Sequence, residues 1–347
     1  MSHLASTWGL LLLLPLVLSQ QYELTQTYTA QNFFDEFRFY TGPDPTDGFV
    51  QYVPLETAAH NRLVGNESGL IYLGVDSTNV YPAGGPGRPS VRLESKSTFT
   101  EGLFVLDLTH IPTGCGIWPA FWTVGLGDWP VDGEIDIIEN VNDAIHNNAA
   151  LHAAGECGVS NATDQTGSWK STDCNIEHDK NQGCGTEFSE PYNFGEGFNR
   201  NGGGVYAMEW TSSAINIWFF PSNAVPESIS SPESFYSSHS HPDPSTFNRP
   251  SASFAGDCSS SFTDKFFNHT IVFDTTFCGG WAGGTFGNEG SQCQRSAYAT
   301  SSESCVDFVG SNPEAFSEAY WAFKSLRVWQ KYVQARAGNP ISTSGDF

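Results

Sequence analysis

Short runs of aromatic and β-branched residues recur along the chain, and glycine and proline separate them. Residues 103–108 (LFVLDL), 215–220 (INIWFF) and 271–273 (IVF) are examples. Runs this short, bounded by turn-forming residues, are typical of β-strands. The 35 glycines and 19 prolines leave little room for long helices, and the breaks between runs follow no fixed period. The pattern therefore predicts an all-β protein in which two antiparallel sheets pack as a sandwich.

One strand-like run, residues 133–139 (GEIDIIE), carries three acids among apolar residues. Side chains alternate between the two faces of a strand, so Glu134 and Asp136 share one face. Glu139 is out of phase with them unless a one-residue bulge at Ile137 or Ile138 turns it back. Burying carboxylates is costly unless they serve a purpose. We therefore expect a bulge and a single face that carries three carboxyl groups.

Three neighbouring carboxyl groups repel one another, which separates their pKa values. One group can then stay protonated near neutral pH while another is ionised, as glycoside hydrolysis requires. On a flat strand the α-carbons of Glu134 and Glu139 would lie about 13 Å apart. A retaining enzyme needs a carboxyl separation of only about 5 to 5.5 Å, so spacing alone does not fix the stereochemistry. The alternative to chemistry is the solvated acidic face of a half-exposed sheet.

Aromatic residues flank the acidic run. Residues 116–122 (GIWPAFW) and 127–130 (GDWP) supply three tryptophans and one phenylalanine. Indole rings stack on the apolar faces of sugars and donate one hydrogen bond, which suits a saccharide cleft. Alternation along a strand places Phe121 in the core and Trp122 on the opposite face. We expect Trp122 and Trp129 in the cleft, whereas Trp118 fits the core and the cleft equally well.

The acidic run and its surroundings resemble a known family signature. Residues 133–139, preceded by GIWPAFW and followed by Leu151 and His152, are similar to the signature of glycoside hydrolase family 16 in its bulged, laminarinase-type form. Residues 205–226, 271–283 and 317–329 also resemble segments of secreted fungal endo-1,3(4)-β-glucanases. The resemblance implies a β-jelly-roll of two curved antiparallel sheets with a substrate cleft on the concave face.

The resemblance also implies a mechanism and a set of site residues. Glu134 is implied as the nucleophile, and Glu139 as the general acid and then the general base. Asp136 lies between them and tunes the nucleophile through a shared hydrogen bond, and the reaction retains configuration. His152 is implied to lie near Glu139. The implied lining of the cleft consists of Arg92, Trp122, Trp129, His152 and Trp281.

Two positions depart from the family pattern, and one residue has a second interpretation. Asn140 follows the motif where a small residue is expected, and Gly280 precedes Trp281 where an acid is expected. The second departure weakens the assignment of Trp281 to the cleft. His152 stands in an apolar run, where histidines are more often satisfied core residues than participants in chemistry. We favour participation because of its place in the signature.

The start of the chain predicts an exported protein. Residues 9–18 (GLLLLLPLVL) form an apolar stretch that is too short to span a bilayer. This stretch is typical of a signal peptide, and we expect residues 1–19 to be removed. Residues 20–347 then form a single catalytic domain of the family 16 type.

Cysteines and glycosylation sequons agree with an oxidising, extracellular compartment. All eight cysteines follow the predicted leader, and an even number predicts four disulfides whose pairing cannot be read from the sequence. Three sequons begin at Asn66, Asn161 and Asn268, and would place those segments at the surface if they are used. We therefore predict a secreted glycoprotein.

Charge and histidine spacing limit the partners. The formal net charge of −23 repels nucleic acid and anionic membranes, which leaves a neutral polysaccharide as a partner. The resemblance implies that this polysaccharide is β-glucan, and we expect a monomer. None of the nine histidines has the spacing of a catalytic zinc site. We therefore expect no metal and no cofactor in catalysis; a structural calcium ion is compatible with the sequence but cannot be read from it.

Together these features predict a secreted endo-acting enzyme that hydrolyses internal β-1,3 and mixed β-1,3/1,4 glucosidic bonds by double displacement. One alternative is a cell-wall transglycosylase on the same fold, which would use the same covalent intermediate. Another is a non-catalytic glucan-binding recognition protein, although such a protein would be expected to have lost the acids.

Overall fold

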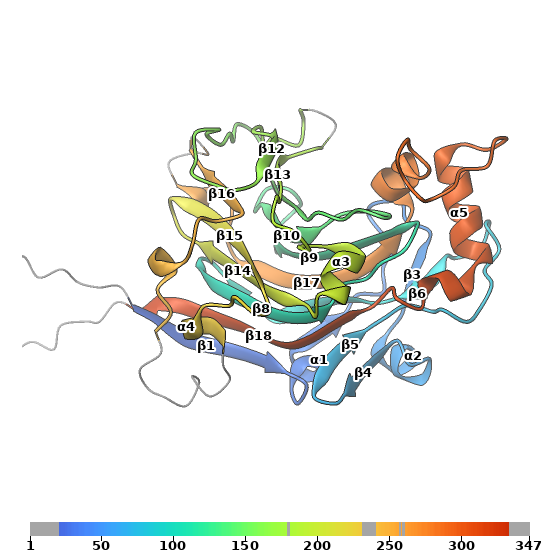
Figure 1. Ribbon diagram of the computed structural model, residues 1–347, viewed down its shortest axis with the longest axis horizontal. Coiled ribbons are helices and arrows are strands. Elements are labelled where there is room, and N and C mark those ends of the chain that lie inside the picture. Colours follow the sequence, from blue (N-terminus) through green and yellow to red (C-terminus); the bar gives the residue numbers. More distant parts are fainter. Residues whose placement is uncertain (1–20, 179–180, 231–240, 257, 259–260, 333–347) are drawn as a thin grey trace, which may run out of the picture.

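The chain folds into two large antiparallel sheets, sheet A and sheet B, packed face to face (Figure 1). The structure is a computed structural model that describes residues 21–178, 181–230, 241–256, 258 and 261–332. The predicted signal peptide lies outside these residues. No helix in the described ranges is long and apolar enough to cross a membrane.

Sheet A has eight strands, and strand β1 (Gln21–Thr29) joins it by pairing with β18. The order of the remaining strands is β16 (Ala252–Ala255), β15 (Ala214–Pro221), β14 (Gly204–Trp210), β8 (Gly102–His110), β18 (Trp321–Tyr332), β5 (Leu70–Leu73) and β4 (Val64–Glu67). The apolar runs 103–108 and 215–220 form the centres of β8 and β15, as predicted.

Sheet B also has eight strands and carries the acidic run. Its order is β12 (Ser168–Ser171), β13 (Cys184–Glu187), β11 (Asn148–His152), β10 (Glu134–Glu139), β9 (Ile117–Gly125), β17 (His269–Phe277), β7 (Arg92–Phe99) and β2 (Phe37–Phe39). A separate parallel pair joins β3 (Val50–Tyr52) to β6 (Arg88–Ser90).

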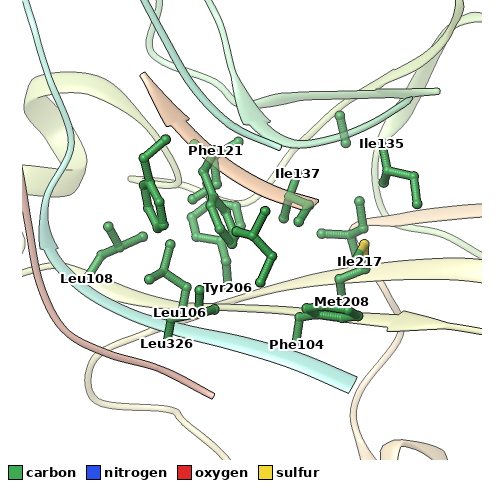
Figure 2. Close-up of a cluster of buried hydrophobic side chains, with 14 of the residues drawn as sticks. Phe104, Leu106, Leu108, Phe121, Ile135, Ile137, Tyr206, Met208, Ile217 and Leu326 are labelled. Carbon is green, nitrogen blue, oxygen red and sulfur yellow. The ribbon is translucent and has the colours of Figure 1, made fainter. Parts of the chain in front are cut away.

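The main core fills the space between the two sheets. Figure 2 shows Phe121 and Ile135 of sheet B facing Phe104 and Met208 of sheet A. Phe121 also stacks on Phe273 of β17, with 4.6 Å between the ring centroids. Successive side chains point to opposite faces of a strand, so Trp122 and Asp136, which follow Phe121 and Ile135, lie on the other face of sheet B. The predicted core position of Phe121 is confirmed.

Short helices and disulfides hold the loops around this sandwich. The α-helices are α1 (Phe33–Glu36), α2 (Leu55–His60), α3 (Gly195–Arg200), α4 (Glu227–Ser230) and α5 (Ser301–Ser311). The remaining helical turns are η2 (Pro244–Thr246), η3 (Phe262–Asp264), the π-turn η4 (Gly279–Gly283) and η5 (Pro313–Phe316). All eight cysteines are paired, as Cys115–Cys293, Cys157–Cys258, Cys174–Cys184 and Cys278–Cys305, which confirms four disulfides.

Candidate active site

Strand β10 carries all three acids, and a bulge brings them to one face. The pairing of β10 with β9 runs through Asp136, resumes at Ile138 and skips Ile137. A skipped residue is the signature of a bulge, and it restores the phase of Glu139. Glu134, Asp136 and Glu139 all line one cleft on the outer face of sheet B, while the isoleucines point into the core. The predicted bulge is therefore confirmed at Ile137.

A buried asparagine holds this bulge in place. Asn147 Nδ2 donates to the carbonyl oxygen of Ile137 at 2.9 Å, and its Oδ1 accepts from the backbone N–H of Glu139 at 3.0 Å. A bulge interrupts the ladder and leaves backbone groups that need other partners. One side chain, itself 0% exposed, supplies both. Asn147 therefore fixes the position from which Glu139 enters the cleft, and the sequence analysis missed it.

The cleft brings together all eight residues that the sequence suggested. Its volume is about 990 Å³, within the usual size range of ligand pockets. Trp118 lines it too, so the open question about this residue is resolved in favour of the cleft. The ring of Trp118 meets Trp281 edge to face at 5.5 Å between centroids. The predicted residues in the lining are Arg92, Trp122, Trp129, Glu134, Asp136, Glu139, His152 and Trp281.

Each of the two outer carboxyl groups accepts a hydrogen bond from one indole. Trp129 Nε1 donates to Glu134 Oε2 at 2.8 Å, and Trp118 Nε1 donates to Glu139 Oε1 at 2.7 Å. A donor stabilises the ionised form of a carboxyl group and fixes the orientation of its plane. Each glutamate therefore has one oxygen held by an indole and a second oxygen left for chemistry.

His152 lies beside the central acid. Its Nε2 is 3.3 Å from Asp136 Oδ2, and its Nδ1 shares a hydrogen bond of 3.0 Å with Asn181 Oδ1. Burial lowers the pKa of His152, but the hydrogen bond and charge of Asp136, with the charges of both glutamates, outweigh burial and raise it to about 10. The acid that His152 contacts directly is thus Asp136, and the positive charge of the histidine offsets part of the repulsion among the acids.

Burial and mutual repulsion raise the pKa values of both glutamates. Burial is the larger cause at Glu134, followed by the charge of Asp136, and the pKa rises to about 8 although His152 and Trp129 oppose the change. Burial and Asp136 raise the pKa of Glu139 well above its usual value, and the charge of Glu134 adds to that rise. A raised pKa favours the protonated form of a carboxyl group near neutral pH, as the sequence analysis expected for an acid in this cleft.

The same groups could in principle hold a metal ion. Glu134, Asp136 and His152 each place one ligand atom within 4.8 Å of the other two. A histidine binds a metal only through an unprotonated ring nitrogen. The Nε2 of His152 faces a carboxylate, and the raised pKa of the ring keeps a proton on it. The donor set thus suits an ion pair better than a metal site.

A second cluster of cleft residues surrounds Arg92. The guanidinium lies over the rings of Tyr40 and Trp122, 4.7 and 4.9 Å from their centroids, and pairs with Glu94 at 2.9 Å. One face of Trp122 is therefore covered by Arg92. Asp274, which the sequence analysis missed, lines the cleft here; burial raises its pKa to about 7 although Arg92 opposes the change.

A family model and a curated relative match most of the chain. The model described as "XgeA-like, catalytic GH16 domain" matches residues 37–329. A probable endo-1,3(4)-β-glucanase of Aspergillus fumigatus is 43% identical over 329 residues, which is 93% of this chain. The matched part is 48% of that relative, so the chain spans about half of its length.

Two solved structures are similar over 89% of this chain and 100% of their own. One is described as an elongating GH family 16 β-1,3-glucosyltransferase, with a TM-score of 0.81 and 42% identity. The other is laminarinase 16A from Phanerochaete chrysosporium, with β-glucans (6-O-glucosyl-laminaritriose) in both donor and acceptor sites, a TM-score of 0.82 and 38% identity. These matches agree with the predicted jelly-roll fold.

Proposed function

The chain belongs to glycoside hydrolase family 16, and on that premise we propose that it is a secreted endo-β-glucanase. In this proposal it hydrolyses internal β-1,3 and mixed β-1,3/1,4 bonds of β-glucan with retention of configuration, and residues 20–347 form one catalytic domain. The observation that carries the proposal is the bulge at Ile137, which sets Glu134, Asp136 and Glu139 side by side in an aromatic cleft.

In the first step of the proposed mechanism, Glu134 attacks the anomeric carbon through the oxygen that Trp129 does not hold. Glu139 gives its proton to the leaving glucosidic oxygen, so a covalent glycosyl ester forms on Glu134 and a shortened glucan departs. In the second step Glu139 takes a proton from water, whose oxygen displaces Glu134. The raised pKa of Glu139 supports its role as the acid, because it favours the protonated carboxyl group that gives up the proton in the first step.

Asp136 and His152 act in this mechanism through the glutamates. Asp136 lies between them and contributes to the raised pKa of both. Asp136 pairs with His152, and its charge raises the pKa of Glu139, which favours the proton on that acid. No step uses a cofactor or a metal ion.

A reducing-sugar assay on laminarin, lichenan, agarose and chitin tests the substrate class. We expect product from laminarin and lichenan and none from agarose or chitin. Product size separates endo from exo action, because internal cleavage gives oligosaccharides early in the reaction. Cleavage of agarose or chitin alone would contradict the proposal.

A glucosyltransferase is the second candidate, because one of the similar structures carries that description at 42% identity. The two activities share the glycosyl ester on Glu134 and differ in whether water or a sugar hydroxyl releases it. Chromatography of products from laminaritetraose distinguishes them, since only transfer yields oligosaccharides longer than the substrate.

The disulfides support the proposal that the protein is exported. Four disulfides in one chain are typical of an oxidising compartment. We propose that the mature protein acts outside the cell on β-glucan as a monomer.

A further inference from the structure

One wall of the cleft is carried by a helical turn rather than by a strand of sheet B. The π-turn η4 follows β17 and carries Trp281 into the cleft. The ring of Trp281 meets the edge of Trp118, whose Nε1 donates to Glu139 Oε1 at 2.7 Å. π-turns are rare and often occur at functional sites. The position of η4 therefore bears on Glu139 through two indole rings.

The start of this turn is held in an unusual backbone conformation. Cys278, which precedes η4, has a φ of 61° and a ψ of −105°, and residues other than glycine rarely adopt a positive φ. Such a conformation persists only where the surroundings hold it. Here the Cys278 N–H donates to the carbonyl oxygen of Gly116 at 2.8 Å, and the side chain forms a disulfide with Cys305 of α5.

Asn142 holds the other end of the turn. Its Nδ2 donates to the carbonyl oxygen of Ala282 at 3.0 Å and to Thr285 Oγ1 at 3.1 Å. Its Oδ1 accepts from the backbone N–H of Gly116 at 2.8 Å. A backbone N–H only donates and a carbonyl oxygen only accepts, so these partners fix the orientation of the amide. Asn142 is 8% exposed, and both ends of its amide are hydrogen-bonded.

These contacts join the three segments that meet at the proposed acid. Gly116 lies two residues before Trp118, and Ala282 directly follows Trp281. Asn142 itself comes three residues after the acid, in the loop that leaves β10. One buried amide thus links the start of β9, the end of β10 and the turn η4.

Asparagine is the residue type that meets both local demands. The φ of Asn142 is 56°, a region that asparagine visits more readily than most residues because its side chain is short and polar. Glycine would adopt this φ but has no amide. Glutamine has the amide but does not favour this φ. A buried amide is costly unless it is hydrogen-bonded, so the residue at this position is explained by the three segments that it joins.

We propose that Asn142 is a positioning residue for the acid: its amide joins η4 to β9, so that Trp281 and Trp118 keep the arrangement in which the Trp118 indole orients Glu139. The inference rests on the proposed function, in which Glu139 is the acid. Asn142 does not line the cleft, so it acts only through these neighbours.

Asn142→Gly removes the amide while glycine still adopts the backbone conformation, and two substrates separate its effects. Laminaritetraose has a sugar leaving group that needs the proton of Glu139, whereas an activated aryl β-laminaribioside releases a phenolate without it. We expect kcat/KM for laminaritetraose to fall about tenfold or more, and kcat/KM for the aryl substrate to fall about threefold or less.

The pH profile supplies a readout that a purely structural role would not move. The charged groups that act on Glu139 are Asp136, His152 and Glu134, and the variant leaves all three in place. Loss of the fixed Trp118 N–H should raise the pKa of Glu139, so the alkaline limb of kcat/KM should move to higher pH. In a Trp118→Phe background Asn142→Gly should cause no further shift, because the N–H is already absent.

Two more variants complete the test. Asn199→Ala is the matched control, because the Asn199 amide also bonds one backbone N–H and one carbonyl oxygen, both of Ile111, and lies outside the cleft lining. It should lose a comparable amount of thermal stability with unchanged kinetics. Thr285→Val removes the hydroxyl that bonds Asn142 and the carbonyl oxygen of Trp281. It should cause a smaller shift in the same direction, and it carries the test if Asn142→Gly unfolds.

Wild-type kinetics of the folded Asn142 variant on both substrates would overturn the inference. An equal loss on both substrates with an unmoved alkaline limb would overturn it too, because Asn142 would then support the fold alone. Failure of the wild type to turn over either substrate would instead contradict the proposed function, so the two failures are distinguishable.

Discussion

The two faces of sheet B are formed by the same strands, but one face stabilises the fold and the other carries the candidate chemistry. The inner face presents Ile135, Phe121 and their neighbours to sheet A in a dry, stacked core (Figure 2). The outer face, one residue further along each strand, presents Asp136 and Trp122 to the cleft. Apolar burial stabilises the fold, whereas buried carboxyl groups destabilise it unless they stay protonated or paired.

The raised pKa values express this difference as a dependence on pH. The pKa of Glu134 is about 8 in the folded chain against an ordinary 4.5, so the folded state holds its proton more tightly than the unfolded state. The stability that this proton contributes is complete below pH 4.5 and is lost as the pH rises towards 8. Asp274, with a pKa of about 7, acts in the same direction. Deprotonation of the cleft acids therefore lowers the free energy of unfolding near neutral pH, and the apolar burial of the inner face offsets this loss.

The largest effect is expected from a substitution of the nucleophile, which should remove activity without loss of stability. Glu134→Ser removes the attacking oxygen but leaves the aromatic cleft, so hydrolysis should fall by several orders of magnitude while laminarin oligosaccharides still bind. Thermal stability should not fall at neutral pH, because a buried acid is removed. Activity is measured by reducing sugars and binding by calorimetry. Hydrolysis comparable to wild type would remove Glu134 from the mechanism.

The inner face should give the opposite phenotype. Phe121→Ala deletes a ring that stacks on Phe273, and should cost about 3 to 5 kcal/mol of unfolding free energy. The specific activity of the molecules that remain folded should be nearly unchanged. Trp122→Ala is the matched variant on the cleft face and should lower kcat with little loss of stability. An exchange of the two phenotypes, seen by denaturation and kinetics, would contradict the assignment of the faces.

Asn147 connects the faces, because its buried amide pins the bulge that sets Glu139. Asn147→Ala leaves a backbone carbonyl and an N–H without these partners, so it should cost about 1 to 3 kcal/mol. It should also lower kcat about tenfold or more, since small displacements of a catalytic group are expensive. Asn312→Ala, which removes a bond to Phe308 in α5, is the control. A stable Asn147 variant with normal kcat would show that the bulge keeps its geometry without the hydrogen bonds of Asn147.

The smallest expected change is a shift in the pH profile. Trp118→Phe keeps an aromatic ring but removes the N–H that stabilises ionised Glu139. The pKa of Glu139 should therefore rise further, and the alkaline limb of the kcat/KM profile should move to higher pH, with a loss of rate of several-fold. A downward shift of this limb, or none, would mean that Trp118 does not tune the acid.

Residues whose role follows from the alternation of side chains along their own strand were predictable from the sequence. Without a bulge, strand alternation would place Glu139 and Glu134 on opposite faces, so a bulge could be predicted. The same alternation assigned Phe121 to the inner face and Trp122 to the cleft face. The capping box of α5, formed by Thr300 and Glu303, could also have been recognised in the sequence, but the sequence analysis overlooked it.

Residues whose role depends on distant partners were not predictable. Asn147 acts through a bulge on another strand, and no local pattern marks it. Asp274 belongs to the cleft only because β17 lies beside β9. The disulfides join residues up to 178 positions apart, so their pairing follows from the topology.

The central claim is that Glu134 attacks and Glu139 transfers the proton. Azide rescue of Glu139→Ala on an activated aryl β-laminaribioside tests it most directly, because azide can replace the lost base at the glycosyl ester. The account predicts restored turnover and a glycosyl azide of retained β configuration, read by NMR from the anomeric proton coupling. An azide of inverted configuration would contradict it, because the roles of the two glutamates would then be exchanged.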